Sequence, residues 1–474
     1  MPTHKLNTKR VILVGFAFFL ISAFWQAYDS IIPLMLTNRF GLPQTASGAI
    51  MALDNIFALF MLPLFGSISD RSKSKYGKRT PFIFIGTICA IVSFIVLTFI
   101  DNMQLAKISL DIQNMYPANV SDPALKEEML KTVIAKTLEI TMDNPLPLIL
   151  FIAGLLIVLM SMATFRSPAV ALMPDVTLKP LRSKGNAVIN LMGTAGGILV
   201  LVLGKFLKTS KNVYMSYTLY IILVCAIMAI GLAIFMFFVK EKEWNREMLE
   251  QQAILDKNAP EEEKVAEAET KLPKKKLISL LLILASVALW FTGYNAVTTK
   301  FSLYATNVLE QDFNVTLIVA QGAAIVSYIP VGIIASKMGR KKTILAGVAM
   351  LATAFTGAIF IRSTTSPVVM YALFALAGIA WATINVNSFP MVVELAKGGN
   401  IGKYTGYYYT ASMTAQVITP ILSGFFMDNI NYRTLFPYAA IFVTLSFITM
   451  LFVKHGDSTP KKQGALESLA GADD

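Results

Sequence analysis

The sequence contains little charge, little histidine and little cysteine. Only 15% of its 474 residues are Asp, Glu, Lys or Arg, whereas a typical soluble domain carries about a quarter. The two histidines, His4 and His455, lie near the ends of the chain, and the two cysteines, Cys89 and Cys225, lie in apolar runs. This scarcity argues against a disulfide framework or a metal cluster. The chain also has no nucleophile–histidine pair and no GxxxxGK[ST] phosphate loop, so the sequence predicts no enzyme and no cofactor.

The chain is instead rich in long apolar runs. Hydrophobic residues make up 55% of it and the mean hydropathy is +0.61. Runs of 18 or more apolar residues recur, each long enough to cross a hydrocarbon core about 30 Å thick. Inside a lipid bilayer a helix satisfies every backbone polar group within its own segment. We therefore predict an all-α polytopic membrane protein with twelve spans, at residues 11–36, 46–69, 80–100, 147–174, 184–206, 215–239, 277–308, 313–336, 343–362, 367–394, 402–427 and 434–453.

The distribution of Lys and Arg predicts the orientation of these spans. Twelve spans place both termini on one side, and the segments on that side hold 29 Lys and Arg residues against 10 on the opposite side. Positively charged loops stay in the cytoplasm, so both termini are expected there, in a multi-pass protein of the plasma or inner membrane. This rule also accounts for the net charge of +12, and no nucleic-acid partner is expected. We expect the chain to function as a monomer.

The polar segments divide the chain into two bundles. Residues 1–239 are predicted to form an N-terminal six-helix bundle, and residues 277–453 a C-terminal one. Residues 240–276, charged with both signs, form a cytoplasmic linker with some helix, and residues 454–474 form a cytoplasmic tail. The outer segment 101–146 is expected to fold as a short helical cap outside the membrane.

A basic loop occurs at the same place in each half. The sequence SDRSKSKYGKRTPF joins the second and third spans, and SKMGRKKTI joins the eighth and ninth. The recurrence indicates two parallel repeats of six helices, an architecture of transporters whose substrate site lies between the halves near the bilayer midplane. Glycines in both loops suit turns at positive φ. We interpret the loops as a gate rather than as ordinary positive-inside loops, with candidate gating residues Asp70, Arg71, Gly77, Lys78, Arg79, Lys337, Gly339 and Arg340.

These loops resemble those of the major facilitator superfamily. The stretch PLFGSISDRSKSKYGKRTPFI is similar to the corresponding part of the sucrose–proton symporters and related sugar transporters, in the glycoside–pentoside–hexuronide cation symporter group. The resemblance implies two six-helix halves and proton-coupled transport by alternating access. The sucrose symporters carry an arginine two residues after the proline of the motif seen here as SPAVALMPD. This chain has Val170 there and carries Arg166 one helical turn earlier. We therefore assign the role of the symporters' arginine to Arg166, at a different position.

Four charged residues lie deep within predicted spans, where charge is costly and indicates function. Asp29 and Asp54 each lie about nine residues from the outer end of a span, roughly 13 Å deep. Arg166 and Lys300 lie at comparable depths. We predict Asp54 and Asp29 as proton-coupling carboxylates, with Arg166 and Lys300 as substrate ligands. The alternative is a set of structural ion pairs, or, for Lys300 and Asp29, side chains that extend outward to the interface.

Polar and aromatic residues at mid-depth complete a predicted sugar site. Amide side chains both donate to and accept from hydroxyl groups, and aromatic faces suit the apolar side of a sugar ring. Gln26 shares a helical face with Ser22 and Asp29. The candidates are Trp25, Gln26, Tyr28, Asn55, Asn190, Asn295, Asn385, Asn387, Tyr408 and Gln416. For each one singly, polar contact between helices is the competing interpretation.

The sequence therefore predicts a secondary transporter that couples a proton to symport of a glycoside or disaccharide. The alternatives are a sodium-coupled sugar symporter, an exporter of another small metabolite, and a membrane receptor that does not transport. The identity of the sugar, the coupling ion, the direction and the stoichiometry stay open at this stage.

Overall fold

In the computed structural model of the chain, the described residues are 6–118, 120, 122–178, 181–258, 273–393, 395 and 401–455. Within them the chain is helical throughout and contains no strand. Eleven helices of this described part are long and apolar enough to cross a membrane. A further long helix, α15 (Ile401–Asn429), occupies the predicted eleventh span, and its tyrosine-rich, polar sequence lowers its hydropathy. The predicted all-α polytopic fold is confirmed.

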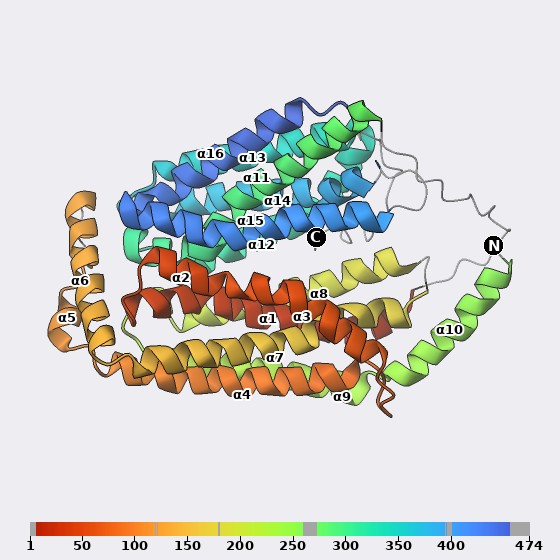
Figure 1. Cartoon of the computed structure of the whole chain (residues 1–474), viewed down its shortest axis with the longest axis horizontal. Coiled ribbons are helices and arrows are strands. Elements are labelled where there is room, and N and C mark those ends of the chain that lie inside the picture. The colour runs from red at the N-terminus through yellow and green to blue at the C-terminus, as the bar shows by residue number, and fades with distance from the viewer. Residues whose placement is uncertain are drawn as a thin grey trace.

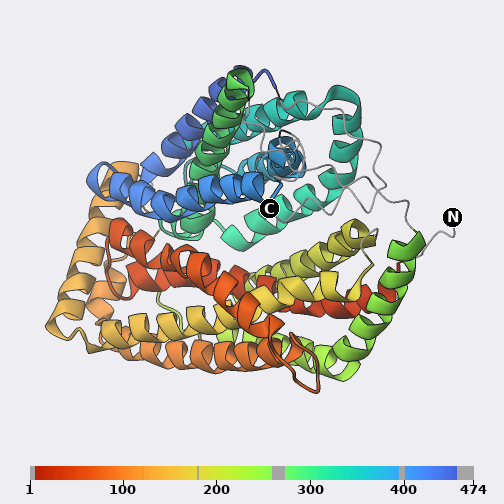
Figure 2. The same cartoon turned by 45° about the vertical axis from the view of Figure 1, so that its right-hand side comes forward.

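The spanning helices form two bundles, one from each half of the chain, which lie side by side in both views (Figures 1 and 2). The N-terminal half contains α1 (Thr8–Asn38), α2 (Gln44–Met51), α3 (Leu53–Asp70), α4 (Thr80–Leu105), α7 (Leu146–Val176), α8 (Arg182–Phe206) and α9 (Thr218–Phe238). The C-terminal half contains α11 (Lys274–Tyr304) with the π-helical turn η2 (Ala305–Leu309), α12 (Phe313–Met338), α13 (Arg340–Ile359), α14 (Pro367–Val393), α15, the short η3 (Tyr432–Thr434) and α16 (Leu435–Leu451).

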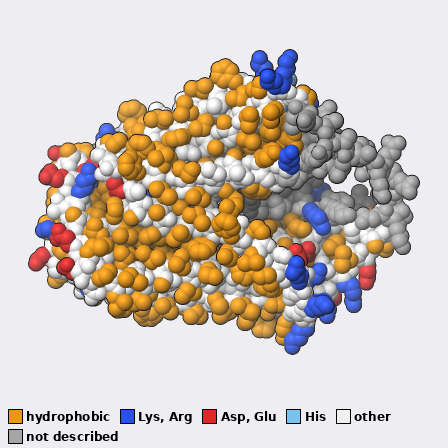
Figure 3. All heavy atoms as spheres, in the orientation of Figure 1, with side chains coloured by type: hydrophobic (Ala, Val, Ile, Leu, Met, Phe, Trp, Pro, Cys, Tyr) orange, Lys and Arg blue, Asp and Glu red, His pale blue; other side chains and the backbone are white. Residues whose placement is uncertain are grey.

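The molecule has two polar ends separated by an apolar belt (Figure 3). The cap end carries α5 (Leu110–Asn114) and α6 (Pro123–Asp143). The basic end carries the loop 71–79, the turn 339–342 and α10 (Glu241–Asn258). Apolar side chains cover the face between these ends, as expected for a surface in contact with lipid acyl chains.

The predicted span 46–69 is not one continuous helix. It is interrupted at Ala52, where α2 ends and α3 begins. The interruption places Asp54 in the first turn of a new helix. The outer segment also differs from the expected short cap, because α4 continues to Leu105 and α6 alone has 21 residues.

Helix α10 occupies the first part of the predicted linker. Residues 259–272 of the linker and 456–474 of the tail lie outside the described residues.

The halves contact each other mainly along three pairs of helices, with smaller contacts of α3 on α15 and of α6 on η2. Within the N-terminal half α1 packs on α8 and α4 on α7, and within the C-terminal half α12 and α13 pack on α14 and α11 on α16. Between the halves, α2 packs on α15, α8 on α12 and α1 on α11. The inner faces of these pairing helices enclose the candidate site.

Candidate functional site

A cavity of about 700 Å³ lies between the halves. Helices α1, α7 and α8 supply one wall, and helices α11 to α15 supply the other. The polar lining residues are Ser22, Gln26, Asp29, Ser30, Arg166, Asn186, Asn190 and Thr194 from the N-terminal half, and Thr298, Ser302 and Gln321 from the C-terminal half. The two lining residues with ionisable acidic or basic side chains, Asp29 and Arg166, both come from the N-terminal half.

Helix α1 presents one polar face to the cavity. Ser22, Gln26 and Asp29 are spaced four and three residues apart, so a helix brings them to the same side, and all three line the cavity. Gln26 Nε2 donates to Ser30 Oγ at 3.2 Å. Gln26 Oε1 accepts from Gln321 Nε2 at 2.6 Å, across the boundary between the halves. These three residues of α1 thus form part of the cavity wall, and their roles in coupling and substrate binding stay predictions.

The mid-depth acids and the arginine gather at this wall. The Arg166 guanidinium lies 5.8 Å from the centroid of the Trp25 ring. Asp29 and Asp54 lie near enough to Arg166 for their charges to interact with it. Asp54 itself is not among the residues that line the cavity. Its carboxylate accepts from the Asn55 backbone N–H at 2.6 Å and from Asn55 Nδ2 at 2.8 Å.

Several polar atoms around the cavity have no hydrogen-bond partner among the described residues. They are Trp25 Nε1, Tyr28 Oη and both amide atoms of Asn190. Buried polar atoms in proteins are nearly always paired with protein, water or ligand. Trp25 and Asn190 also line the cavity, but these atoms are buried in this conformation, so their side chains would have to turn toward the cavity to bind a solute.

The C-terminal half supplies an aromatic wall that the sequence analysis missed. Tyr294 and Trp381 stack with ring centroids 3.6 Å apart and an interplanar angle of 4°. Phe291 meets Trp381 edge to face at 5.2 Å. Tyr328 and Tyr409 also line the cavity. Aromatic residues are common in apolar spans, so their presence does not single out a binding site. Gln321, a lone amide at mid-depth in its span, is the one missed residue that could have been found by the criterion used for the amides of the N-terminal half.

Other predicted ligands lie outside the cavity lining. Lys300 is fully buried, and its Nζ donates to the Gln44 carbonyl at 2.8 Å. Tyr408 shares a hydrogen bond of 2.9 Å with Ser388 Oγ, and Asn387 Nδ2 donates to the Thr383 carbonyl. The predicted ligands that do not line the cavity in this conformation are Lys300, Tyr28, Asn55, Asn295, Asn385, Asn387, Tyr408 and Gln416.

A polar seam closes the cavity on the side of the cap end. Asn38 and Asn307 exchange two side-chain hydrogen bonds across the halves, at 2.8 and 3.3 Å. Tyr116 Oη donates to Asn307 Oδ1 at 3.1 Å. Further out, Lys126 of α6 pairs with Glu310 at the end of η2. The cap end is therefore closed in this conformation.

The cavity extends from its centre toward the basic end. It reaches Asn186, four residues after the start of α8, and Tyr409, eight residues after the start of α15. On this side α8 touches the other half through Ala187, which clusters with Tyr328 and Val331. Figure 3 shows a recess between the halves in the same direction. The conformation is therefore closed at the cap end and faces the basic end.

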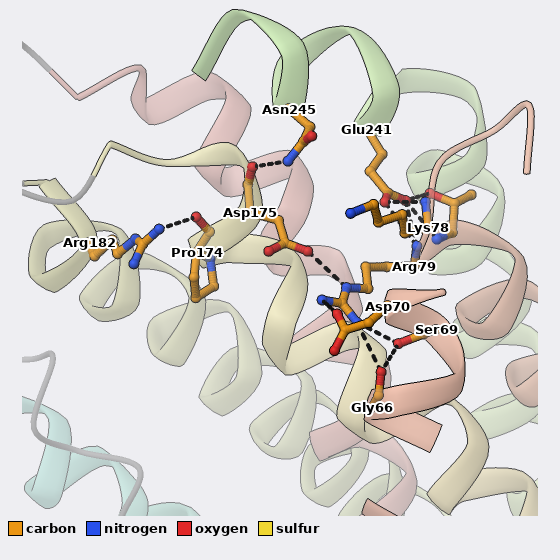
Figure 4. Close-up of polar contacts among 11 residues, drawn as sticks. Gly66, Ser69, Asp70, Lys78, Arg79, Pro174, Asp175, Arg182, Glu241 and Asn245 are labelled. Atoms are coloured by element: carbon orange, nitrogen blue, oxygen red, sulfur yellow. Dashed lines mark hydrogen bonds and ion pairs between the residues drawn. The ribbon is translucent and has the colours of Figure 1, made fainter. Parts of the chain in front are cut away.

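The loop at the basic end is organised around Arg79 (Figure 4). Its guanidinium pairs with Asp70, with Asp175 at 2.8 Å and with Ser69 Oγ at 2.5 Å. Burial disfavours the charge of Arg79, but the hydrogen bonds and charges of Asp175 and Asp70 outweigh it and raise the pKa of Arg79. The arginine thus joins the end of α3, the end of α7 and the start of α4.

A carboxylate from α10 caps the start of α4. Glu241 accepts from the backbone N–H groups of Lys78 at 2.6 Å and Thr80 at 2.7 Å, and also from Thr80 Oγ1. Gly77 has φ +124°, a backbone conformation that other residues rarely adopt, and a Cβ there would also crowd the Glu241 carboxylate at 2.3 Å. Gly339 also has positive φ, +88°. Both predicted loop turns are confirmed.

These loop contacts connect helices of the N-terminal half and α10. Arg10 pairs with Glu247 at 2.6 Å, and Asn245 Nδ2 donates to the Asp175 carbonyl at 2.6 Å. Arg71, Lys78 and Lys337 have exposed side chains, whereas Arg340 is buried. The gating role of the loop residues stays a prediction.

Comparisons with known proteins agree with this architecture. A Major Facilitator Superfamily model matches residues 132–384 and 307–471, and an MFS/sugar transport protein model matches residues 13–112. An uncharacterized MFS-type transporter of Methanocaldococcus jannaschii is 23% identical over 450 residues, which cover 94% of this chain and 95% of that protein.

Solved structures share the fold at low sequence identity. The inward-open xylose transporter XylE from E. coli has a TM-score of 0.63 at 15% identity, over 98% of this chain and 99% of that chain. A bacterial homologue of the iron transporter ferroportin, in an inward-facing state, has 0.63 at 12% identity, over 94% and 99%. The nucleoside transporter NupG has 0.56 at 14% identity, over 94% and 99%.

Two bundles of long apolar helices around a central cavity define a membrane transporter rather than an enzyme. The chain belongs to the major facilitator superfamily.

Proposed function

We propose that this transporter couples a proton to symport of a glycoside or disaccharide by alternating access. The observation that carries the proposal is the division of the cavity. One wall holds Asp29 and Arg166 beside unpaired hydrogen-bonding groups, and the opposite wall is aromatic and uncharged. We place the protein in the plasma or inner membrane with the basic end and both termini in the cytoplasm. In that orientation the conformation described here is inward-facing.

The cavity suits a neutral solute rich in hydroxyl groups. Its volume of about 700 Å³ lies within the usual range of small-molecule sites. Amides such as Gln26, Asn190 and Gln321 can each donate and accept, as sugar hydroxyls require. The stacked pair of Tyr294 and Trp381 offers an apolar ring face. An exported metabolite of similar chemistry is the competing substrate.

Two carboxylates can couple transport to a proton. Asp54 and Asp29 lie near one another and near Arg166. An unpaired anion is costly in a dry, occluded cavity, so protonation of a carboxylate lowers the free energy of the state that carries the solute across. The same two carboxylates favour sodium as the second candidate ion, because Na⁺ can also neutralise them.

Transport assays in proteoliposomes test the proposal. Labelled disaccharides, monosaccharides and nucleosides are offered with an inward pH gradient, with an inward Na⁺ gradient, and with neither. Accumulation of a disaccharide or glycoside above equilibrium only with the pH gradient supports the proposal. Accumulation driven by the Na⁺ gradient alone would identify sodium, not the proton, as the coupling ion. Accumulation of nucleosides alone would identify nucleosides, not glycosides, as the substrate class.

A further inference from the structure

The first turn of α2 is capped by the opposite half of the molecule. Helix N-termini usually receive a side-chain cap from the residue just before them. Here that residue is Pro43, which supplies no side-chain hydrogen bond. Asp428, at the end of α15, fills the role: its carboxylate accepts from the backbone N–H groups of Gln44 and Thr45, both at 2.7 Å, and from Thr45 Oγ1 at 2.6 Å.

A buried lysine contacts the same turn. Lys300 of α11 is 0% exposed, and its Nζ donates to the Gln44 carbonyl at 2.8 Å and to Gln44 Oε1 at 3.3 Å. Gln44 Nε2 in turn donates to Thr37 Oγ1 at 2.9 Å. Gln44 of the N-terminal half is therefore held by an anion and a cation, both of which belong to the C-terminal half.

The backbones of α2 and α15 touch at this crossing. A Cβ added to Gly48 would lie 1.9 Å from the Pro420 carbonyl oxygen, and one added to Gly424 would lie 2.3 Å from the Gln44 carbonyl oxygen. Such close contact excludes water. The bonds of Asp428 and Lys300 act there in a medium of low effective dielectric constant, where charge interactions are strong.

Opening of the cap end must break these contacts. When the halves part, the first turn of α2 leaves with the N-terminal half, while Lys300 and Asp428 stay together on the other. A charge left without a partner in a protein interior is strongly unfavourable. Since the two charges are opposite and lie close enough to interact, each can replace its bonds to α2 by pairing with the other.

We propose that Asp428 and Lys300 form a charge-exchange gate at the cap end. In the closed state Asp428 caps α2 and Lys300 binds Gln44. In the open state the two residues pair with each other. The gate concerns access to the cavity only, so it holds for whichever solute and ion the transporter carries, and its failure would leave the proposed substrate class untouched.

The test measures access to the cavity from the cap side. Thr298, which lines the cavity on α11, is replaced by cysteine in a Cys89→Ser, Cys225→Ser background. The labelling rate with a membrane-impermeant thiol reagent added on the cap side is then measured for Asp428→Asn. The substitution weakens the three bonds of the closed-state cap and also removes the open-state pair with Lys300. Because three bonds to the carboxylate are weakened in the closed state and one pair is lost in the open state, the closed state loses more and the rate should rise several-fold.

Asp312→Asn is the matched control. Asp312 caps its own helix, α12, through the Asn314 backbone N–H at 2.9 Å, so this variant loses the charge of a cap whose donor lies in the same half. Asp312 also accepts from Asn314 Nδ2, which keeps its own bond to Thr209 Oγ1 of the other half when Asp312 is changed. The labelling rate of this variant should equal that of the parent. Thr45→Val loses only the closed-state bond of its hydroxyl to Asp428 and keeps the open-state pair, so it should also raise the rate, and it serves if Asp428→Asn does not fold. Equal rates for the Asp428, Thr45 and Asp312 variants overturn the proposal.

Discussion

At the scale of single residues, Arg166 combines charge with planar geometry. Its guanidinium lines the cavity and lies against Trp25. Lysine keeps the charge but loses the planar fork that binds two acceptors at once. We expect Arg166→Lys to weaken the apparent affinity for the proposed sugar substrate about tenfold or more, the effect of losing one hydrogen bond to a charged group. Competition against the labelled sugar measures this affinity. An unchanged affinity would mean that Arg166 only balances the charge of the nearby carboxylates.

Asp54 carries the coupling prediction at the same scale. Asparagine matches the protonated carboxyl in shape and neutrality, and its amide oxygen can still accept from Asn55. Asp54→Asn should therefore abolish uphill accumulation driven by a pH gradient and leave exchange of sugar across the membrane measurable. Both activities are compared in the same proteoliposome preparation. Full accumulation by this variant would transfer the coupling role to Asp29, and the matched Asp29→Asn variant shows which carboxylate is needed.

At the scale of elements, the crossing of α2 and α15 decides whether the cap end can close. The added methyl group in Gly424→Ala meets the backbone of Gln44 at 2.3 Å, where no flexible side chain can move aside. The two helices must separate, so we expect transport to fall at least tenfold and the cap side to stay open. Gly406→Ala on the same helix is the control, because nothing lies within 4 Å of its Cβ position. Equal transport by both variants contradicts the prediction.

The loop between α3 and α4 gives a second prediction at this scale. Asp70 is 61% exposed, so its pair with Arg79 contributes about 0–1 kcal/mol to the free energy of unfolding. Arg79 keeps its bond to Asp175 when Asp70 is changed. We expect Asp70→Asn to fold normally and to slow the transport cycle several-fold, since the predicted gate loses one of the two carboxylates that pair with Arg79. The exposed Lys73→Gln is the control, and a transport rate equal to the parent's removes Asp70 from the gate.

At the scale of the whole molecule, the two polar ends predict an orientation. The basic end carries α10 and the loop of Arg79, and the cap end carries α6. An impermeant thiol reagent should label Glu128→Cys on α6 in intact cells. It should label Lys242→Cys on α10 only after the cells are permeabilised. Both positions are exposed, so access through the membrane is the difference measured. Labelling of Lys242→Cys on intact cells reverses the proposed orientation.

Much of the architecture could be predicted from the sequence, because in a lipid bilayer the structure of each span depends on residues close together in the chain. A bilayer forces each span to pair its backbone within itself, so long apolar runs gave the helices directly. Helical periodicity placed Ser22, Gln26 and Asp29 on one face, and both loop glycines adopt positive φ. These features depend only on residues near one another in the chain.

Contacts between helices were decided by the tertiary structure alone. The spans are apolar around most of their circumference, so the sequence does not fix how far each helix rotates about its axis. Rotation turned Lys300 toward Gln44, enclosed Tyr408 with Ser388, and brought Tyr294 onto Trp381. The cap of α2 by Asp428 joins residues 384 positions apart. The sequence by itself determined the helices, the two halves and the depth of the charges, and long-range packing decided which side chains face the cavity and which close it.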